Sequence, residues 1–250
     1  MRVRVVFTAA IAVMTAAPAW AQSKPLLAPR TTLPSHVMCA DMLVPALPTP
    51  GLRIAGAHHA EIRLALNRGD VAVVPRLLGD GLAVGQRYLV RRLPWGQQAI
   101  LPNEGGYWPI RTVGWITITA LDEFNALANV DHSCDALEPD DYLVPYVEPV
   151  LPSPDATLPA PDFTERVQIL PGLEGRQIFA AGDTLSIARG TDDGVVVGAR
   201  YAIYRDRKDG KPLVPIAEAI VTDPSVASAK LIVTTTRDVV EVTDIAVPRR

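Results

Sequence analysis

The residues whose types are suited to chemistry are four histidines, two cysteines and two adjacent pairs of aspartates. His58 and His59, with Glu61 close behind, form the one group with the donor types of a metal site. Neighbouring residues on a strand point to opposite faces, so two adjacent imidazoles do not readily reach one ion. We therefore expect a solvated strand start at this position and no metal.

The aspartate pairs are Asp140–Asp141 and Asp192–Asp193, and their carboxylates are of the type that calcium prefers. A calcium site needs six or more oxygen ligands, and the alternating aspartate spacing of an EF-hand loop is missing from both places. Ordinary turn aspartates fit these pairs better. The pairs therefore predict turns.

The short motifs of common catalytic sites are also missing. The sequence has no G-x-S-x-G elbow, no H-E-x-x-H helix, no Walker loop and no Rossmann glycine fingerprint. A Ser-His-Asp triad stays open, because geometry and not spacing assembles its members. We expect a protein that is not an enzyme and that uses no cofactor.

The first 21 residues have the pattern of a secretory signal peptide. Arg2 and Arg4 precede the apolar run VVFTAAIAVMTAA, and Ala19-Trp20-Ala21 forms a small-x-small cleavage site. The apolar run is too short to span a bilayer, and we expect no transmembrane span after cleavage. An uncleaved N-terminal anchor is the alternative. Cleavage predicts a soluble mature chain in the periplasm or outside the cell.

The two cysteines, Cys39 and Cys134, would then lie in a compartment where disulfides persist. An even count there favours a bridge. In the chain-entropy model, closing a loop of this length contributes roughly 4–5 kcal/mol. Two small buried side chains that never meet are the alternative. We predict the Cys39–Cys134 disulfide.

The chain contains a tandem repeat. Residues 69–92, GDVAVVPRLLGDGLAVGQRYLVRR, align without a gap to residues 182–205, GDTLSIARGTDDGVVVGARYAIYR. The match resumes with 113–145 against 216–248, at an offset that falls from 113 to 103. The first copy therefore carries ten extra residues, which lie within 93–112.

Both copies predict β-structure, since short runs of alternating apolar residues are separated by Gly, Pro, Asn and Asp. Asp209-Gly210 predicts a two-residue hairpin. Turns that need glycine at positive φ explain much of the repeated motif. The predicted turn residues are Asp80, Gly81, Gly85, Asp193, Gly194 and Gly198. The expected fold is all-β, with two tandem small antiparallel barrel-like domains.

The domain boundaries follow from proline. Residues 149–162, PVLPSPDATLPAPD, favour an extended semi-rigid linker, because proline fixes φ and removes a backbone donor. We expect a signal peptide, a proline-rich tail, a first β-domain, this linker and a second β-domain. Their ranges are 1–21, 22–36, 37–148, 149–162 and 163–250.

Aromatic residues gather in the segment where the first copy is longer. Trp95, Tyr107 and Trp108 lie there, and aromatic side chains bury a large area with few torsions to freeze. We expect these three residues to be candidates for binding a partner. The alternative is that the rings fold back to cover an open end of the barrel.

These residues also carry a family resemblance. The pattern G-D-V-x-V-V…D-G-x-x-V-G-x-R-Y-x-V-x-R, then V-G-x-I, then SCDALEPDDYLVP, resembles a β-repeat of bacterial cell-envelope proteins. Some of those proteins carry a LysM peptidoglycan-binding module, and we find no LysM repeat here. The pattern is more distantly similar to the C-terminal β-domain of flagellar assembly protein T. In the relatives a short Cys-containing segment precedes the first repeat, as VMCADML does here.

The sequence therefore favours a non-catalytic exported scaffold or binding module of the cell envelope. Its partner would be an envelope protein or a cell-wall glycan. A formal charge of −3, with no basic stripe, gives no sign of a nucleic-acid partner. An accessory subunit of a secretion or flagellar-type assembly is the first alternative. A hydrolase of envelope polymers is the second, and it needs a close pair of carboxyl groups that the sequence does not indicate.

Overall fold

The computed structural model describes residues 33–250 except 50, 60–64, 77–78, 95–105 and 148–156. The described part of the chain is nearly all β, with one short α-helix, α1 (Ser35–Cys39). Two 3-10 turns, Leu173–Gly175 and Thr191–Asp193, complete the helical residues. The prediction of an all-β antiparallel fold is confirmed.

The N-terminal half forms one antiparallel sheet with the strand order β2-β3-β6-β5-β4-β7, and β1 pairs with β5 beside this path. We call it the sheet. Its strands are β1 (Met42–Val44), β2 (Gly56–Ala57), β3 (Val71–Pro75), β4 (Arg87–Arg92), β5 (Trp108–Leu121), β6 (Asn125–Ser133) and β7 (Tyr142–Pro145).

The C-terminal half closes into a barrel with the order β10-β13-β12-β11-β15-β8. We call it the barrel. Its strands are β8 (Val167–Leu170), β10 (Thr184–Ile187), β11 (Arg200–Arg205), β12 (Val214–Pro224), β13 (Ala229–Thr236) and β15 (Ile245–Pro248). A short pair, β9 (Ile178–Phe179) with β14 (Val240–Glu241), lies beside it.

The sequence repeat corresponds to a repeated topology. The order β3-β6-β5-β4-β7 in the sheet matches β10-β13-β12-β11-β15 in the barrel. The strand pairing also shifts at equivalent places, between Ile118 and Ala120 in β5 and between Val221 and Asp223 in β12. Positions of the two halves can therefore be compared one by one.

Each half has its own hydrophobic core. In the sheet the core includes Val74, Val90, Ile116 and Val130, all inaccessible to solvent. A separate cluster fills the barrel. Alternate strand residues supply these cores, as expected for strands with one buried face.

The predicted turn glycines have the backbone that such turns require. Gly81 and Gly194 have φ of 68° and 77°, and Gly85 and Gly198 have φ of 87° and 84°. A side chain is strained in this left-handed region. Asp80 stabilises its turn by accepting a hydrogen bond from the backbone N–H two residues later, at 3.0 Å. The Asp193 carboxylate accepts one from the backbone N–H three residues earlier, at 3.2 Å.

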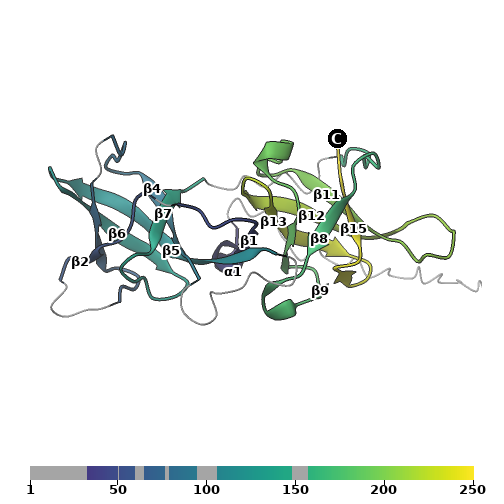
Figure 1. Ribbon diagram of the computed structural model, residues 1–250, viewed down its shortest axis with the longest axis horizontal. Helices are drawn as coiled ribbons and strands as arrows, with labels where there is room; N and C mark the ends of the chain where they lie inside the picture. The colour runs from purple at the N-terminus through teal and green to yellow at the C-terminus, as the bar shows by residue number, and fades with distance from the viewer. Residues whose placement is uncertain (1–32, 50, 60–64, 77–78, 95–105, 148–156) are drawn as a thin grey trace, which may run out of the picture.

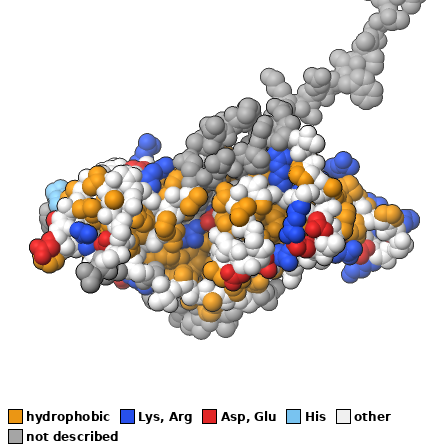
Figure 2. Space-filling view, turned by 90° about the horizontal axis from the view of Figure 1, so that it is seen from above, with side chains coloured by type: hydrophobic (Ala, Val, Ile, Leu, Met, Phe, Trp, Pro, Cys, Tyr) orange, Lys and Arg blue, Asp and Glu red, His pale blue; other side chains and the backbone are white. Residues whose placement is uncertain are grey.

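The hairpin predicted at Asp209-Gly210 is longer than expected. β11 ends at Arg205 and β12 begins at Val214, so the two residues lie inside a longer connection. Gly210 still turns with φ of 75°. Figure 1 shows this connection projecting at the end of the molecule far from the sheet, and Lys and Arg side chains stand out at that end in Figure 2.

A repeated arginine explains the acidic residues shared by the two copies. The Nε of Arg92 lies 2.7 Å from Oδ1 of Asp141, and the Nε of Arg205 lies 2.8 Å from Oδ1 of Asp244. In both copies the carboxylate also accepts a hydrogen bond from the backbone N–H three residues before it, at 2.8 Å. The hydrogen bonds from the guanidinium groups to Asp141 and Asp244 raise the pKa of both arginines. The shared residues therefore hold β4 to the loop before β7, and β11 to the loop before β15.

The sheet and the barrel lie side by side along the long axis of the molecule, and α1 and β1 lie between them (Figure 1). Contacts between β1 and β13 connect the two halves directly. The division into two domains at a linker of residues 149–162 stays a prediction.

Candidate functional site

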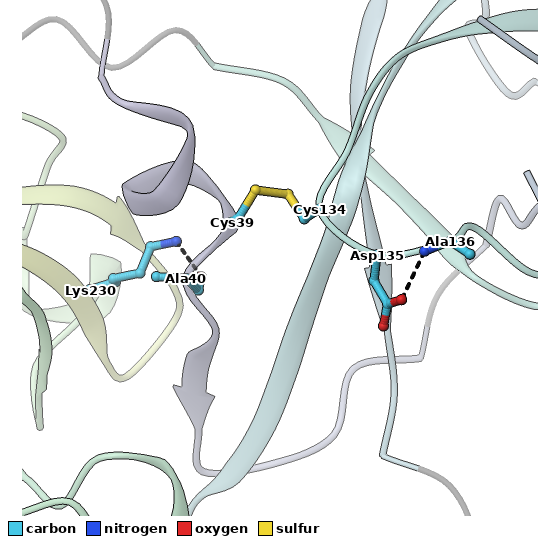
Figure 3. The surroundings of a disulfide bond; sticks show 6 residues. All are labelled: Cys39, Ala40, Cys134, Asp135, Ala136 and Lys230. Atoms are coloured by element: carbon cyan, nitrogen blue, oxygen red, sulfur yellow. Dashed lines mark hydrogen bonds between the residues drawn. A yellow bond between two sulfur atoms is a disulfide. The ribbon is translucent and has the colours of Figure 1, made fainter. Parts of the chain in front are cut away.

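The most elaborate polar site lies at the junction of sheet and barrel, around residues 35–44, which we call the α1–β1 segment. In this segment β1 pairs with the start of β5, where Val44 lies opposite Trp108. Cys39 at the end of α1 is bonded to Cys134, with 5.5 Å between the Cα atoms. The predicted disulfide is confirmed, and it ties the segment to the sheet just beyond β6 (Figure 3).

The backbone of the α1–β1 segment accepts hydrogen bonds from the barrel. The Nζ of Lys230 donates to the backbone oxygen of Ala40 at 2.8 Å (Figure 3). The Oγ of Ser228 donates to the backbone oxygen of Leu43. Both donors are almost fully buried. A buried polar group is costly without a partner, so these bonds fix where the barrel lies against the segment.

Three charged side chains join the two halves beside these bonds. The Nη2 of Arg91, in β4, lies 2.5 Å from Oδ2 of Asp223, in β12. The Nζ of Lys230, in β13, lies 3.7 Å from the same oxygen. One carboxylate therefore serves two cations, and the three form a compact ion cluster at the junction.

Burial and charge act in opposite directions in this cluster. Burial lowers the pKa of Lys230, and the nearby Asp223 carboxylate opposes that shift. Burial also disfavours the ionised form of Asp223, but Arg91 and Lys230 outweigh it and hold its pKa below the ordinary value. Asp41 is different, because burial raises its pKa in spite of the nearby Arg111. Asp223 is therefore an ionised structural partner at neutral pH.

Two small clefts adjoin Lys230 on the junction. One has a volume of about 230 Å³ and is lined by residues of both halves, among them Val37, Leu89, Arg91 and Asp223. The other, of about 220 Å³, lies between the α1–β1 segment and the barrel. Ligand pockets usually measure about 300–1,000 Å³, so these clefts are small for a substrate.

The barrel surface against this junction has a definite composition, and we call it the barrel wall. It consists of Ser186, Val197, Thr222, Asp223 and Lys230, which line the two clefts. Ser186, Thr222 and Lys230 are 8%, 6% and 3% exposed. The barrel wall is thus polar and is covered by the chain itself.

The equivalent surface of the sheet consists of Val73, Val84, Thr119, Ala120 and Leu127, and we call it the sheet wall. The strand pairings match, because Leu127 lies opposite Val73 and Ala120 just as Lys230 lies opposite Ser186 and Asp223. Thr119 and Ala120 are exposed, and Val84 is 61% exposed. Where the barrel wall has Asp223 and Lys230, the sheet wall has Ala120 and Leu127. Three of its five residues are exposed.

The turn that follows Ala120 of the sheet wall carries an exposed aromatic ring. Phe124, in the turn between β5 and β6, is 69% exposed. Two hydrogen bonds from the backbone N–H groups of Phe124 and Asn125 to Asp122 fix this turn, at 2.7 and 2.6 Å. They also lower the pKa of Asp122. The ring is thus carried by an ordered turn.

The two described residues among the sequence-predicted contact residues lie outside the sheet wall. Trp95 falls outside the described residues. Tyr107 is half-buried just before β5, and Trp108 packs against a core cluster that includes Met42 and Tyr142. Trp108 thereby helps to hold β1 in place. A partner-binding role for these three aromatic residues stays a prediction.

The described residues that the sequence suggested for metals do not form a group of three or more metal donors. His58 and His59 are exposed and follow β2, with 4.9 Å between their ring centroids, and Glu61 lies outside the described residues. Asp141 pairs with Arg92, and Asp193 belongs to a 3-10 turn.

The structure instead assembles a group that the sequence reasoning missed. One ligand atom each of Cys39, His132 and Cys134 lies within 4.8 Å of the other two. The ring of His132 stacks on Trp115, with centroids 4.3 Å apart and planes 14° apart. The signal for the group was the H-x-C spacing beside a predicted disulfide, since alternate residues of a strand share a face.

No protein-family model matches this chain, and no curated protein matches it. Among the residues that the structure describes, none forms a helix with the length and hydropathy of a membrane span.

Proposed function

We propose that the protein is a non-catalytic exported binding or scaffold module of the bacterial cell envelope, built from two β-domains joined at residues 149–162. The signal-peptide pattern and the tandem repeat support this proposal. The mature chain would then begin at Gln22 in the periplasm or outside the cell. The mass of the protein recovered from the periplasm checks that start, and a chain that retains residues 1–21 there would contradict it.

The observation that carries the proposal is the different use of two equivalent surfaces. The α1–β1 segment covers the barrel wall, whereas three of the five residues of the sheet wall are exposed and four of the five are apolar. Val84 and Phe124 are more than half exposed at its edge. Exposed apolar side chains that gather on one surface are typical of interaction sites. We infer that the sheet wall binds a partner.

The intramolecular contact indicates the kind of partner. On the barrel wall the occupant is a short helix followed by a strand, held by side-chain hydrogen bonds to its backbone and by apolar packing. The sheet wall has Leu127 where the barrel has Lys230, so its occupant needs more apolar side chains. We propose a protein segment of this helix–strand type. A glycan fits less well, because the wall offers few polar groups.

The charged residues of the described chain support a non-catalytic role. The most buried carboxylates, Asp141 and Asp244, are each held by an arginine, and Asp223 is held by two cations. A glycosidase-type acid needs a raised pKa in a cleft beside a second carboxylate. Among the described aspartates Asp41 alone has a raised pKa, and the described residues that line its cleft, between the α1–β1 segment and the barrel, include no second carboxylate.

Affinity capture from envelope extract tests the proposal when it is run with matched variants. Ala120→Lys alters the sheet wall, and Phe124→Ser alters the turn that follows it, both at exposed positions. Ile178→Ser, at a position that is 54% exposed on the barrel, is the control. We expect a protein that is retained by the wild type and by the control and lost with both wall variants. Retention that is equal in all four, or that peptidoglycan alone supports, would overturn the sheet wall as the binding surface.

A further inference from the structure

We propose that Cys39, His132 and Cys134 form a metal site once the disulfide is reduced, and that it takes a thiophilic cation, Cu(I) or Zn(II). Two thiolates and one imidazole are a donor set for such ions, because thiolates select Cu(I) and Zn(II) and imidazole suits both metals. The inference stands apart from the binding function proposed above.

The positions of the three donors carry the proposal. Their ligand atoms already lie within 4.8 Å of one another. Two ligands on a tetrahedral zinc ion are separated by about 3.8 Å when its bonds to sulfur are about 2.3 Å long. Reduction frees the two sulfur atoms to separate, and a small movement then brings all three donors around one ion.

The chain also orients the donors. His132 lies in β6 and Cys134 directly follows the last residue of that strand, Ser133, and ligand atoms of the two lie within 4.8 Å of each other. Trp115 lies opposite His132 in the β5–β6 pairing, and its indole stacks on the imidazole. Ligand orientation by neighbouring groups strengthens a metal site, and here an aromatic plane limits the rotation of the ring.

The chemistry balances with an ordinary dithiol as reductant. The dithiol loses two electrons and two protons and becomes a disulfide. The Cys39–Cys134 disulfide gains these electrons and protons and becomes two thiols. Binding of the cation releases the two thiol protons, and neutral His132 supplies the third donor. A zinc ion would take water in its fourth position.

Such a site has a structural consequence, because Cys39 belongs to the α1–β1 segment. The carbonyl oxygens of that segment accept the hydrogen bonds of Lys230 and Ser228 from the barrel. The disulfide ties the segment to the sheet in the oxidised protein. A bound ion would keep the same tie in the reduced protein.

The test is a metal titration of the full mature chain under anaerobic conditions, with and without prior dithiol reduction and removal of the dithiol. Cu(I) and Zn(II) are each titrated in competition with a chromophoric chelator. We expect one ion of at least one metal per reduced chain and none per oxidised chain. X-ray absorption of the loaded protein should show two sulfur ligands and one imidazole nitrogen.

Variants identify the donors. His132→Gln should weaken the affinity of the reduced protein at least about tenfold, which is the scale of disturbing a metal site. His58→Gln, at an exposed histidine, should leave it unchanged. The Cys39→Ser/Cys134→Ser pair should bind neither metal. Reduced protein that takes up no metal, folded or unfolded, would overturn the proposal, and so would equal affinity in the His132→Gln variant.

Discussion

Arg91 and Asp223 form an ion pair, with 2.5 Å between Nη2 and Oδ2, although 132 residues separate them in the chain. Arg91 belongs to the sheet and Asp223 to the barrel, so the pair fixes one half against the other. Lys230 shares the carboxylate and reaches the α1–β1 segment as well. Specific side-chain contacts therefore hold the two halves together, in addition to the covalent chain.

Removal of Asp223 should be costly. Asp223→Ala leaves the Lys230 ammonium and the Arg91 guanidinium buried without their carboxylate, and breaking a buried pair costs about 3–5 kcal/mol. Urea unfolding of the variant at neutral pH measures the loss. Asp192→Ala, at an exposed turn, is the matched control and should change the free energy of unfolding by less than about 0.5 kcal/mol. Equal stability of the two variants would contradict the structural role of the ion cluster.

Neutralisation of Asp41 should stabilise the protein, in contrast to the removal of Asp223. Its pKa is raised by burial, so the folded protein holds a proton there over a pH range in which the unfolded chain has lost it. Stability from this group is therefore lost as the pH rises from the ordinary value of 3.8 through the raised pKa. Asp41→Asn should raise the melting temperature at neutral pH and have little effect in acid. A lower melting temperature at neutral pH would show that the ionised carboxylate is a net stabiliser.

The disulfide should contribute a large part of the stability of the oxidised protein. It closes a loop with a sequence separation of 95. Closing a loop of this length contributes about 4–5 kcal/mol in the chain-entropy model. Cys39→Ser/Cys134→Ser should lose that amount in urea unfolding without added metal. Reduction of the wild type should give the same loss, and a change below about 1 kcal/mol in both would mean that strain in the folded state offsets the entropy.

The local features of the fold followed from the sequence. Gly81 and Gly194 mark turns because their need for positive φ is a property of the residue itself. Alternating apolar residues indicated the strands, because successive side chains of a strand point to opposite faces. The alignment of the two copies matched the residues of the arginine–carboxylate pairs, such as Arg92–Asp141, but did not show that they form pairs. Their role emerged from the contact between strand and loop.

The junction and the two walls could not be predicted in this way. The Arg91–Asp223 contact joins residues that no periodicity relates, and equivalent positions of a repeat do not say which copy is covered. Lys230 and Leu127 differ in the sequence, but the difference acquires meaning only when one is buried at the junction and the other lies on an open wall. The group of Cys39, His132 and Cys134 could not be predicted from periodicity either, because Cys39 lies 95 residues before Cys134 in the chain.

Site-specific photo-crosslinking in cells tests the binding function most directly. A photoreactive residue is placed at Val84, Ala120 or Phe124 on and beside the sheet wall, and at Ile178 on the barrel as the control. We expect one discrete protein species to crosslink from all three sheet positions and not from the control. No crosslinked protein from the sheet positions, or the same species from the control position at equal yield, would contradict the binding function.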